Sequence, residues 1–216
     1  GSNLRYLAPF LGGSQDWLLV EQDGSLLGAM PERMRTWINS RHGRSLNAGG
    51  ALHLRSPAFD LRVRSVLVNL STELEGLLIP DGALVTASAL LDLVSENWLV
   101  HLVKRCANAG ATVSFALTVD GRWLCRPPDP ADSKVNALFL AHQQTDKGFG
   151  AALGPRAAER IPKILEDHGY RVRCENSNWL IAPDQRDFQR VLLNGWFEAA
   201  REMVPGSEPE LRKWLD

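Results

Sequence analysis

Polar side chains follow several of the apolar runs that predict buried strands, at the points where these strands end. They are Glu21 and Gln22 after residues 17–20, Asn69 after residues 66–68, and Ser88 after residues 83–87. In open α/β sheets, ligands bind in the crevice outside the carboxyl ends of the strands, so we expect these side chains to line a binding site. A carboxylate such as Glu21 accepts from both ribose hydroxyls, and an amide such as Asn69 pairs with an adenine edge. The alternative is that Glu21 caps a helix or is a solvated surface charge, and that Asn69 is a turn residue.

A candidate general base stands later in the chain. His142 ends an apolar stripe, and Asp146 follows it at a spacing that places both side chains on one helical face. Gly148 and Gly150 bracket Phe149, a pattern that suits a mobile lid. These residues predict proton transfer beside a covered pocket. The alternative is that His142 is a hydrogen-bonded core residue.

Alternating helical and strand patterns must position these residues. Helices are predicted around residues 4–11, 27–38, 74–78, 90–106, 135–142, 158–165 and 188–203, and strands around residues 17–20, 61–68, 83–88 and 112–118. This alternation predicts an α/β fold with a mostly parallel sheet flanked by helices. Pro9 is expected to kink or shorten the first helix, and Pro31 to stand in a first helical turn.

The segments between these elements are predicted from their turn residues. Residues 39–50 are polar and Gly-rich and are expected to form a surface loop. Residues 126–132 contain three prolines and predict a rigid extended connection, within a lid-like insert over residues 127–155. Residues 170–174 and 179–182 are predicted as a C-terminal antiparallel β-hairpin. The whole chain, residues 1–216, is expected to form a single domain.

Composition and charge limit the partners. The 216 residues include 24 Lys and Arg and 25 Asp and Glu, for a net charge of −1. A nucleic-acid enzyme usually carries a basic surface, so a small-molecule substrate is favoured and nucleic acid is not expected. Cys106, Cys125 and Cys174 lack metal-ligand spacing, so we expect reduced thiols, no metal and a cytoplasmic protein. The chain contains no run of about 18 apolar residues, and a membrane location is not expected.

The chain begins in a helical pattern with no strand before it. A doubly wound sheet that started in this way would lack its first strand. We therefore expect the native protein to extend further toward the amino terminus, with the first strand missing from this sequence.

Several stretches resemble the class I, Rossmann-like S-adenosylmethionine-dependent methyltransferases, and more specifically a bacterial subgroup described generically as methyltransferases. They are GSNLRYLAPFLGG, WLLVEQD, VTASALLDLVSENWL, ALTVDGR and HQQTDKGFGAALGP. The resemblance covers nearly the whole chain and is strongest from Thr86 to Pro155. It implies a Rossmann-like sheet that ends in the antiparallel hairpin, and S-adenosyl-L-methionine as the cofactor.

The resemblance also implies roles for individual residues. Glu21 would bind the ribose, with Gln22 beside it, and Asn69 and Leu70 would contact the adenine. The sulfonium side would be lined by Ser88, Ala89 and Leu90. The tail of the glycine-rich loop that binds the methionine part of the cofactor would be Gly1, Ser2 and Asn3. Asp92, Lys147 and Phe149 are assigned to the acceptor substrate or the lid. Asn69 stands where an acidic residue is common in the superfamily, which alters the contact with the adenine amino group.

The expected function is methyl transfer to a small-molecule acceptor by in-line positioning, with His142 as the base and Asp146 orienting it. A noncatalytic Rossmann-like binding or scaffold module is the main alternative. A nicotinamide-dependent oxidoreductase is less favoured, because Tyr6 and Tyr170 are the only tyrosines and no Tyr, Lys pair has catalytic spacing. A nucleic-acid methyltransferase would need a basic face and a loop such as Asn-Pro-Pro-Tyr, where this chain has residues 88–91.

Overall fold

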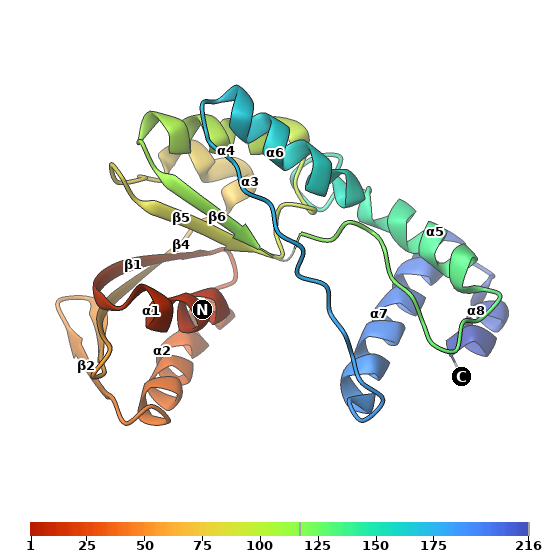
Figure 1. Cartoon of the computed structure of the whole chain (residues 1–216), viewed down its shortest axis with the longest axis horizontal. Coiled ribbons are helices and arrows are strands. Elements are labelled where there is room, and N and C mark those ends of the chain that lie inside the picture. The colour runs from red at the N-terminus through yellow and green to blue at the C-terminus, as the bar shows by residue number, and fades with distance from the viewer. Residues whose placement is uncertain (117, 216) are drawn as a thin grey trace. The chain divides into compact units, whose positions relative to one another are not determined.

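The structure is a computed structural model that describes residues 1–116 and 118–215 (Figure 1). The chain forms two compact units, unit 1 with Gly1–Leu78 and unit 2 with Ile79–Asp216. Each unit combines helices with β-strands, which confirms the predicted α/β class. The single domain over residues 1–216 stays a prediction.

Unit 1 contains a four-stranded sheet and the helices that pack on it. Its elements are α1 (Ser2–Leu11), β1 (Gly13–Glu21), α2 (Gly24–Asn39), β2 (Arg44–Ala48), β3 (Ala51–Arg55), β4 (Phe59–Leu67), α3 (Leu70–Glu73) and a 3-10 turn, Leu74–Gly76. The strand order is β1-β4-β3-β2. Only β1 and β4 pair in parallel, while β2–β3 and β3–β4 are antiparallel. The sheet of unit 1 is therefore mixed, which corrects the expectation of a mostly parallel one.

The antiparallel part of this sheet arises from a hairpin that was predicted as a loop. Ala48 pairs with Ala51, which leaves Gly49 and Gly50 as the two turn residues. Both glycines have positive φ, 57° and 72°, the conformation that a tight two-residue hairpin turn requires. Residues 44–48 carry few apolar side chains because most of this edge strand is exposed, so hydrophobic patterning does not reveal it.

The core of unit 1 lies between the sheet and α1 and α2. Its buried residues are Leu4, Ala8, Met30, Met34, Ile38, Leu52, Leu54, Phe59, Leu61 and Val63. The ring of Trp37 stacks on that of Phe59, with the centroids 5.6 Å apart. Pro9 and Pro31 both lie inside their helices, so the predicted first-turn position of Pro31 is wrong. We attribute the continuity of these helices to the burial of their apolar faces, which offsets the missing backbone hydrogen bond.

Unit 2 begins with a parallel strand pair. Its elements are β5 (Leu84–Ser88), α4 (Glu96–Asn108), β6 (Thr112–Ala116), α5 (Asp132–Gln143), a 3-10 turn (Gly154–Arg156), α6 (Ala157–Asp167), α7 (Arg186–Met203) and α8 (Glu208–Leu215). The pairing of β5 with β6 runs from Leu84 opposite Thr112 to Ser88 opposite Ala116. Leu117, which the prediction included in the second of these strands, lies outside the described residues.

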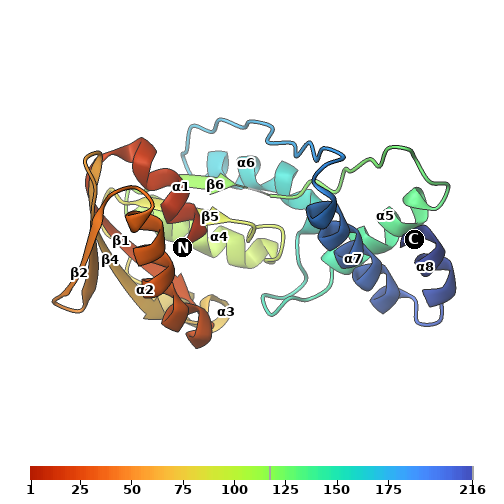
Figure 2. The same cartoon turned by 90° about the horizontal axis from the view of Figure 1, so that it is seen from below.

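The helices α5, α7 and α8 form their own group within unit 2 (Figure 2). Val135, Phe197, Ala200 and Leu211 are its buried core. The indole of Trp123 stacks on Trp196 with the centroids 4.4 Å apart. The sequence predicted α5 and α7 but not α8, a helix of eight residues.

Two predictions in unit 2 are corrected. The helix expected from residue 90 begins at Glu96, because the Ser95 hydroxyl caps it and accepts from the backbone N–H of Trp98 at 3.3 Å. Residues 170–182 form no strand, so the predicted C-terminal hairpin is not seen. Leu180 in this segment is 93% exposed, so the alternating pattern there has no core to pack against.

None of the helices in the described part of the chain is both long and apolar enough to cross a membrane.

Candidate functional site

Unit 1 places two of the predicted cofactor residues at one edge of the sheet. Glu21 is the last residue of β1 and pairs with Leu67, the last residue of β4. The backbone N–H of Val68 donates to the carbonyl oxygen of Glu21 at 2.9 Å, and Asn69 follows directly. Because β1 and β4 are parallel, Glu21 and Asn69 both lie beyond the carboxyl ends of neighbouring strands.

The carboxylate of Glu21 is held within its own turn. Its Oε1 atom accepts from the backbone N–H groups of Gln22 at 2.9 Å and Asp23 at 3.2 Å. No donor among the described residues is bonded to the second oxygen, Oε2, which leaves it free to accept from a hydroxyl.

The helix-capping role proposed as the alternative for Glu21 belongs to Asp23. Asp23 Oδ1 accepts from the Ser25 hydroxyl at 2.6 Å and from the Ser25 N–H at 2.8 Å at the start of α2. The hydrogen bond from the Ser25 hydroxyl is the main cause that lowers the pKa of Asp23, and backbone N–H groups add to it. Glu21 is therefore not needed as the cap of α2.

Asn69 caps α3. Its Oδ1 atom accepts from the Ser71 N–H at 3.0 Å and from the Ser71 hydroxyl at 2.7 Å, and its own N–H donates to Glu73 Oε2 at 2.9 Å. This reciprocal arrangement resembles a capping box, with the capped N–H at N2 and the acid at N4 in place of N3. The oxygen of the amide is thus already used, and its NH₂ group is the part that could donate to a ring nitrogen of adenine. Leu70, also predicted to meet the adenine, is the first residue of α3 and is half-buried.

Gly1, Ser2 and Asn3 lie at the start of α1, in the same unit as Glu21.

Unit 2 contains the second group of predicted residues, beginning at the carboxyl end of β5. Ser88 ends the strand, and the N–H of Ala89 donates to the carbonyl oxygen of Ala116 at 3.1 Å. Ala89 has a φ of 53°, in the left-handed region that residues with a Cβ rarely adopt. Leu90 follows in the turn that leads to α4. Backbone strain of this kind is concentrated at binding and catalytic sites, so Ala89 supports a functional role for this strand end.

The segment after α5 lies against the segment after β5. The N–H of Leu153 donates to Val94 O, and the N–H of Gly154 donates to Asp92 O, both at 2.8 Å. The ring of Phe149 contacts the edge of Trp98 in α4, with the centroids 5.2 Å apart. The predicted lid and the end of β5, which are far apart in the sequence, are thus neighbours within unit 2.

His142 is held by a residue that sequence reasoning missed. Its Nε2 atom lies 2.9 Å from Glu202 Oε2 in α7 and 3.2 Å from Lys147 Nζ. Asp146 instead accepts from the N–H groups of Gly148 at 2.7 Å and Gly150 at 3.0 Å through Oδ1. Glu202, and not Asp146, is therefore the carboxylate that contacts His142. No local spacing signal could have found it, because it is 60 residues away in the sequence.

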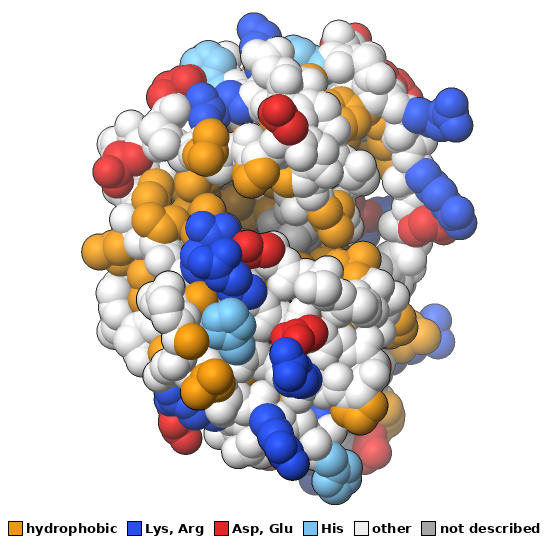
Figure 3. Space-filling view, turned by 90° about the vertical axis from the view of Figure 1, so that its left-hand side faces the viewer, with side chains coloured by type: hydrophobic (Ala, Val, Ile, Leu, Met, Phe, Trp, Pro, Cys, Tyr) orange, Lys and Arg blue, Asp and Glu red, His pale blue; other side chains and the backbone are white. Residues whose placement is uncertain are grey.

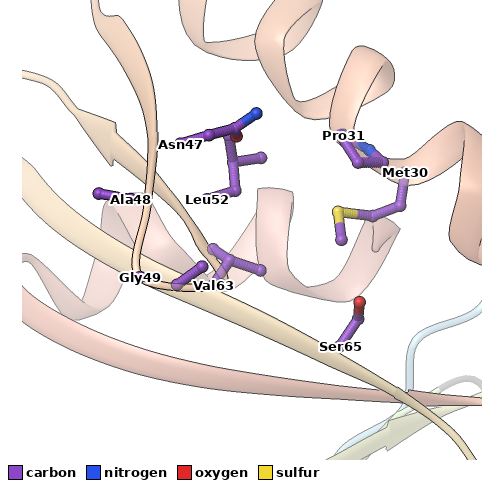
Figure 4. A pocket seen from close by; sticks show the side chains of 10 residues that line it. Met30, Pro31, Asn47, Ala48, Gly49, Leu52, Val63 and Ser65 are labelled. Atoms are coloured by element: carbon purple, nitrogen blue, oxygen red, sulfur yellow. The ribbon is translucent and has the colours of Figure 1, made fainter.

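Two hollows in unit 1 are lined by none of the predicted site residues. The larger, of about 400 Å³, is walled by Met30 and Pro31 of α2 and by Leu52 and Val63 of the sheet, with Asn47 and Ser65 as polar contributors (Figure 4). The smaller, of about 300 Å³, is lined by Ser14, Gln15, Asp16, His53, Arg55, Asp60 and Arg62.

Basic and acidic side chains alternate on the face of the molecule seen in Figure 3. In unit 1, for example, Arg62 and Arg64 share the carboxylate of Asp16, at 3.4 and 3.2 Å, and Arg55 pairs with Asp60 at 2.6 Å. Carboxylates interleaved with arginines in this way weaken the positive potential that a polyanion would need.

No family model, curated protein or solved structure matches the chain. The resemblance to methyltransferases therefore rests on the sequence motifs. The chemistry that it implies depends on the predicted site residues of unit 1 and of unit 2 described above.

Proposed function

We propose that the chain is an S-adenosylmethionine-dependent methyltransferase that acts on a small-molecule acceptor. The observation that carries the proposal is the position of Glu21 and Asn69 beyond the carboxyl ends of the parallel strands β1 and β4, each followed by a helix. Ligands of open α/β sheets bind at this edge, and a strand-tip acid is the usual ribose contact. A Rossmann-like fold is part of the proposal.

The available side-chain atoms fit an adenosine. Oε2 of Glu21 can accept from a ribose hydroxyl, and the amide NH₂ of Asn69 can donate to the adenine ring. In unit 2, Ser88 and Ala89 at the end of β5 are the candidates for the sulfonium side. The bound cofactor supplies a methyl group on a positively charged sulfur.

The residues of this chain would then hold the methyl donor and the acceptor in position and take up a proton from the acceptor. Holding the donor and the acceptor in line is worth up to about 7–11 kcal/mol in favourable systems. If the acceptor loses a proton, His142 is the candidate that receives it, held in place by Glu202. A cytoplasmic location belongs to the same proposal and is supported by the free thiols of Cys106, Cys125 and Cys174.

A noncatalytic binding module is the second candidate, and one observation favours it. Lys147 and Glu202 both approach Nε2 of His142, which keeps that nitrogen occupied. In such a module the same residues would bind the cofactor without turnover.

The test is calorimetric titration of S-adenosylhomocysteine into the whole chain. We expect one binding site per chain with micromolar affinity, equivalent to about −8 kcal/mol. If no heat of binding is found at millimolar ligand, the methyltransferase proposal is wrong. If binding occurs but no acceptor is methylated across a broad panel of amines, alcohols and thiols, the noncatalytic module is favoured.

A further inference from the structure

Three buried side-chain oxygens in unit 2 have no hydrogen-bond partner among the described residues, Oδ1 of Asp92, Oδ1 of Asn136 and Oε1 of Gln143. Two of them belong to residues that are more than nine-tenths buried, Asp92 at 5% exposed and Gln143 at 8% exposed. An unpaired buried acceptor costs about 1–3 kcal/mol, and a charged one costs more. A donor from outside the chain, either a ligand or a buried water, would remove this cost.

Gly154 connects the backbones of these two residues. Its N–H donates to Asp92 O at 2.8 Å, and a Cβ placed on it would lie 3.5 Å from the carbonyl group of Gln143 and 3.1 Å from Cγ of Gln144. The end of α5 and the turn after β5 therefore reach the same residue from two sides. The absence of a side chain at Gly154, together with its φ of 54°, permits this close approach.

The chemistry of the two oxygens restricts what could satisfy them. Both are acceptors, so a single group that pairs with both must donate at least two hydrogen bonds. A hydroxyl group has a single O–H and satisfies one oxygen, whereas an amine or ammonium has two or three N–H donors and satisfies both. Burial is the main cause that raises the pKa of Asp92, and no neighbouring cation contributes to offset it. A positively charged donor would supply that missing compensation.

We propose that Asp92 and Gln143 bind the amino group of the methyl acceptor, which makes the substrate a primary or secondary amine. This inference rests on the proposed methyltransferase function and adds the substrate class to it. Asp92 lies four residues beyond Ser88, in the turn that leaves the strand end assigned to the sulfonium side. An amine held there would be next to the methyl group that it receives.

The test compares two cofactor analogues and does not depend on turnover. S-adenosylhomocysteine has a bare thioether sulfur, while sinefungin has an amine-bearing carbon in place of the methylated sulfur. We expect the native chain to bind sinefungin about tenfold more tightly than S-adenosylhomocysteine in calorimetric titrations. In Asp92→Asn and in Gln143→Met this preference should fall to about twofold or less, with the affinity for S-adenosylhomocysteine nearly unchanged.

Glu166→Gln in α6 is the matched control, because Glu166 is an exposed acid of the same unit and should keep the full preference. Gln143→Met preserves side-chain length and serves as the second variant if Asp92→Asn does not fold. An equal affinity of the native chain for both analogues, or a preference that survives in both variants, would overturn the amine site and leave the two oxygens to buried water. If neither analogue binds the native chain, the proposed function fails as well, so the two failures are distinguishable.

Discussion

Nε2 of His142 lies between a carboxylate and an ammonium group, 2.9 Å from Glu202 Oε2 and 3.2 Å from Lys147 Nζ. A single ring nitrogen cannot donate to the carboxylate and accept from the ammonium at the same time. The shorter distance favours an Nε2–H that donates to Glu202, which leaves Nδ1 as the basic nitrogen of the neutral ring. The contact also joins α5 to α7.

We predict that His142 is the Nε2–H tautomer when neutral, and ¹⁵N NMR of labelled histidine can determine this directly. Glu202→Gln should shift the population toward Nδ1–H, because the amide is a weaker acceptor, and Lys147→Met should increase Nε2–H. Glu202→Ala should destabilise unit 2 by only about 0.5 kcal/mol in urea unfolding, since the Glu202 side chain is 62% exposed. A neutral Nδ1–H tautomer in the native chain would contradict the assignment.

The carboxylate of Glu21 gives the second prediction. Glu21→Gln should weaken S-adenosylhomocysteine binding about tenfold, a loss of about 1.4 kcal/mol, because the amide keeps an acceptor but loses the charge-assisted bond. Asp16→Asn is the matched control, since Asp16 also lies on β1 and its carboxylate pairs with Arg62 and Arg64. Calorimetry on both variants measures the difference. Equal affinities would remove Glu21 from the ribose contact.

Asn69 permits a separation of its capping and binding roles. Asn69→Asp keeps the side-chain oxygen that caps α3 but loses the NH₂ group, whereas Asn69→Ala loses both. We expect Asn69→Ala to lower the free energy of unfolding by about 1 kcal/mol and Asn69→Asp to leave it within about 0.5 kcal/mol. Asn69→Ala should weaken S-adenosylhomocysteine binding, whereas Asn69→Asp should weaken it less, because its second carboxylate oxygen can accept from the adenine amino group. Unfolding in urea and calorimetry provide the two measurements, and normal affinity in Asn69→Ala would show that the residue is only a cap.

The sequence predicted most helices and the parallel strands because these elements bury one continuous face. Met30, Met34 and Ile38 recur at helical spacing and lie in the core of unit 1, as the pattern indicated. The edge strand β2 was missed because Leu46, its one large apolar side chain, is 66% exposed. The C-terminal hairpin was predicted from alternation alone, which does not identify a strand without a partner or a core.

Some residues of the candidate site could be predicted from their neighbours in the sequence, and others depend on contacts between distant segments. Glu21 and Asn69 follow strands directly, so the sequence could place both at strand ends. Glu202 could not be found, because its contact with His142 depends on how α7 packs on α5. The sequence also could not show that the side-chain oxygens of Asp92 and Gln143 lack a hydrogen-bond partner. Their burial depends on how distant segments of unit 2 pack together.

Ala89 gives a prediction about strain. Its φ of 53° costs a residue with a Cβ about 1 kcal/mol or more, and glycine avoids most of that cost. Ala89→Gly should therefore raise the melting temperature slightly or leave it unchanged, although glycine also loses entropy on folding. Ala89→Val should destabilise the chain by more than 1 kcal/mol, because a β-branched residue is poorly tolerated there. Calorimetric melting of both variants measures this, and a destabilising Ala89→Gly would show that the Ala89 methyl group makes a needed contact.

Burial raises the pKa of the Asp92 carboxyl above its ordinary value of 3.8, and the sign of the resulting pH dependence follows from linkage. Between the unfolded and the folded pKa the folded chain binds more protons, so its stability falls as the pH rises through that window. Below pH 3.8 both states are protonated and the penalty is absent. Asp92→Asn removes this titration, so the stability of the variant relative to the native chain should increase as the pH rises from about 4 and level off above the folded pKa. Urea unfolding of both proteins across this range measures the difference. A difference that stays constant with pH would mean that Asp92 is solvated or paired in solution, and it would also weaken the case for an amine beside it.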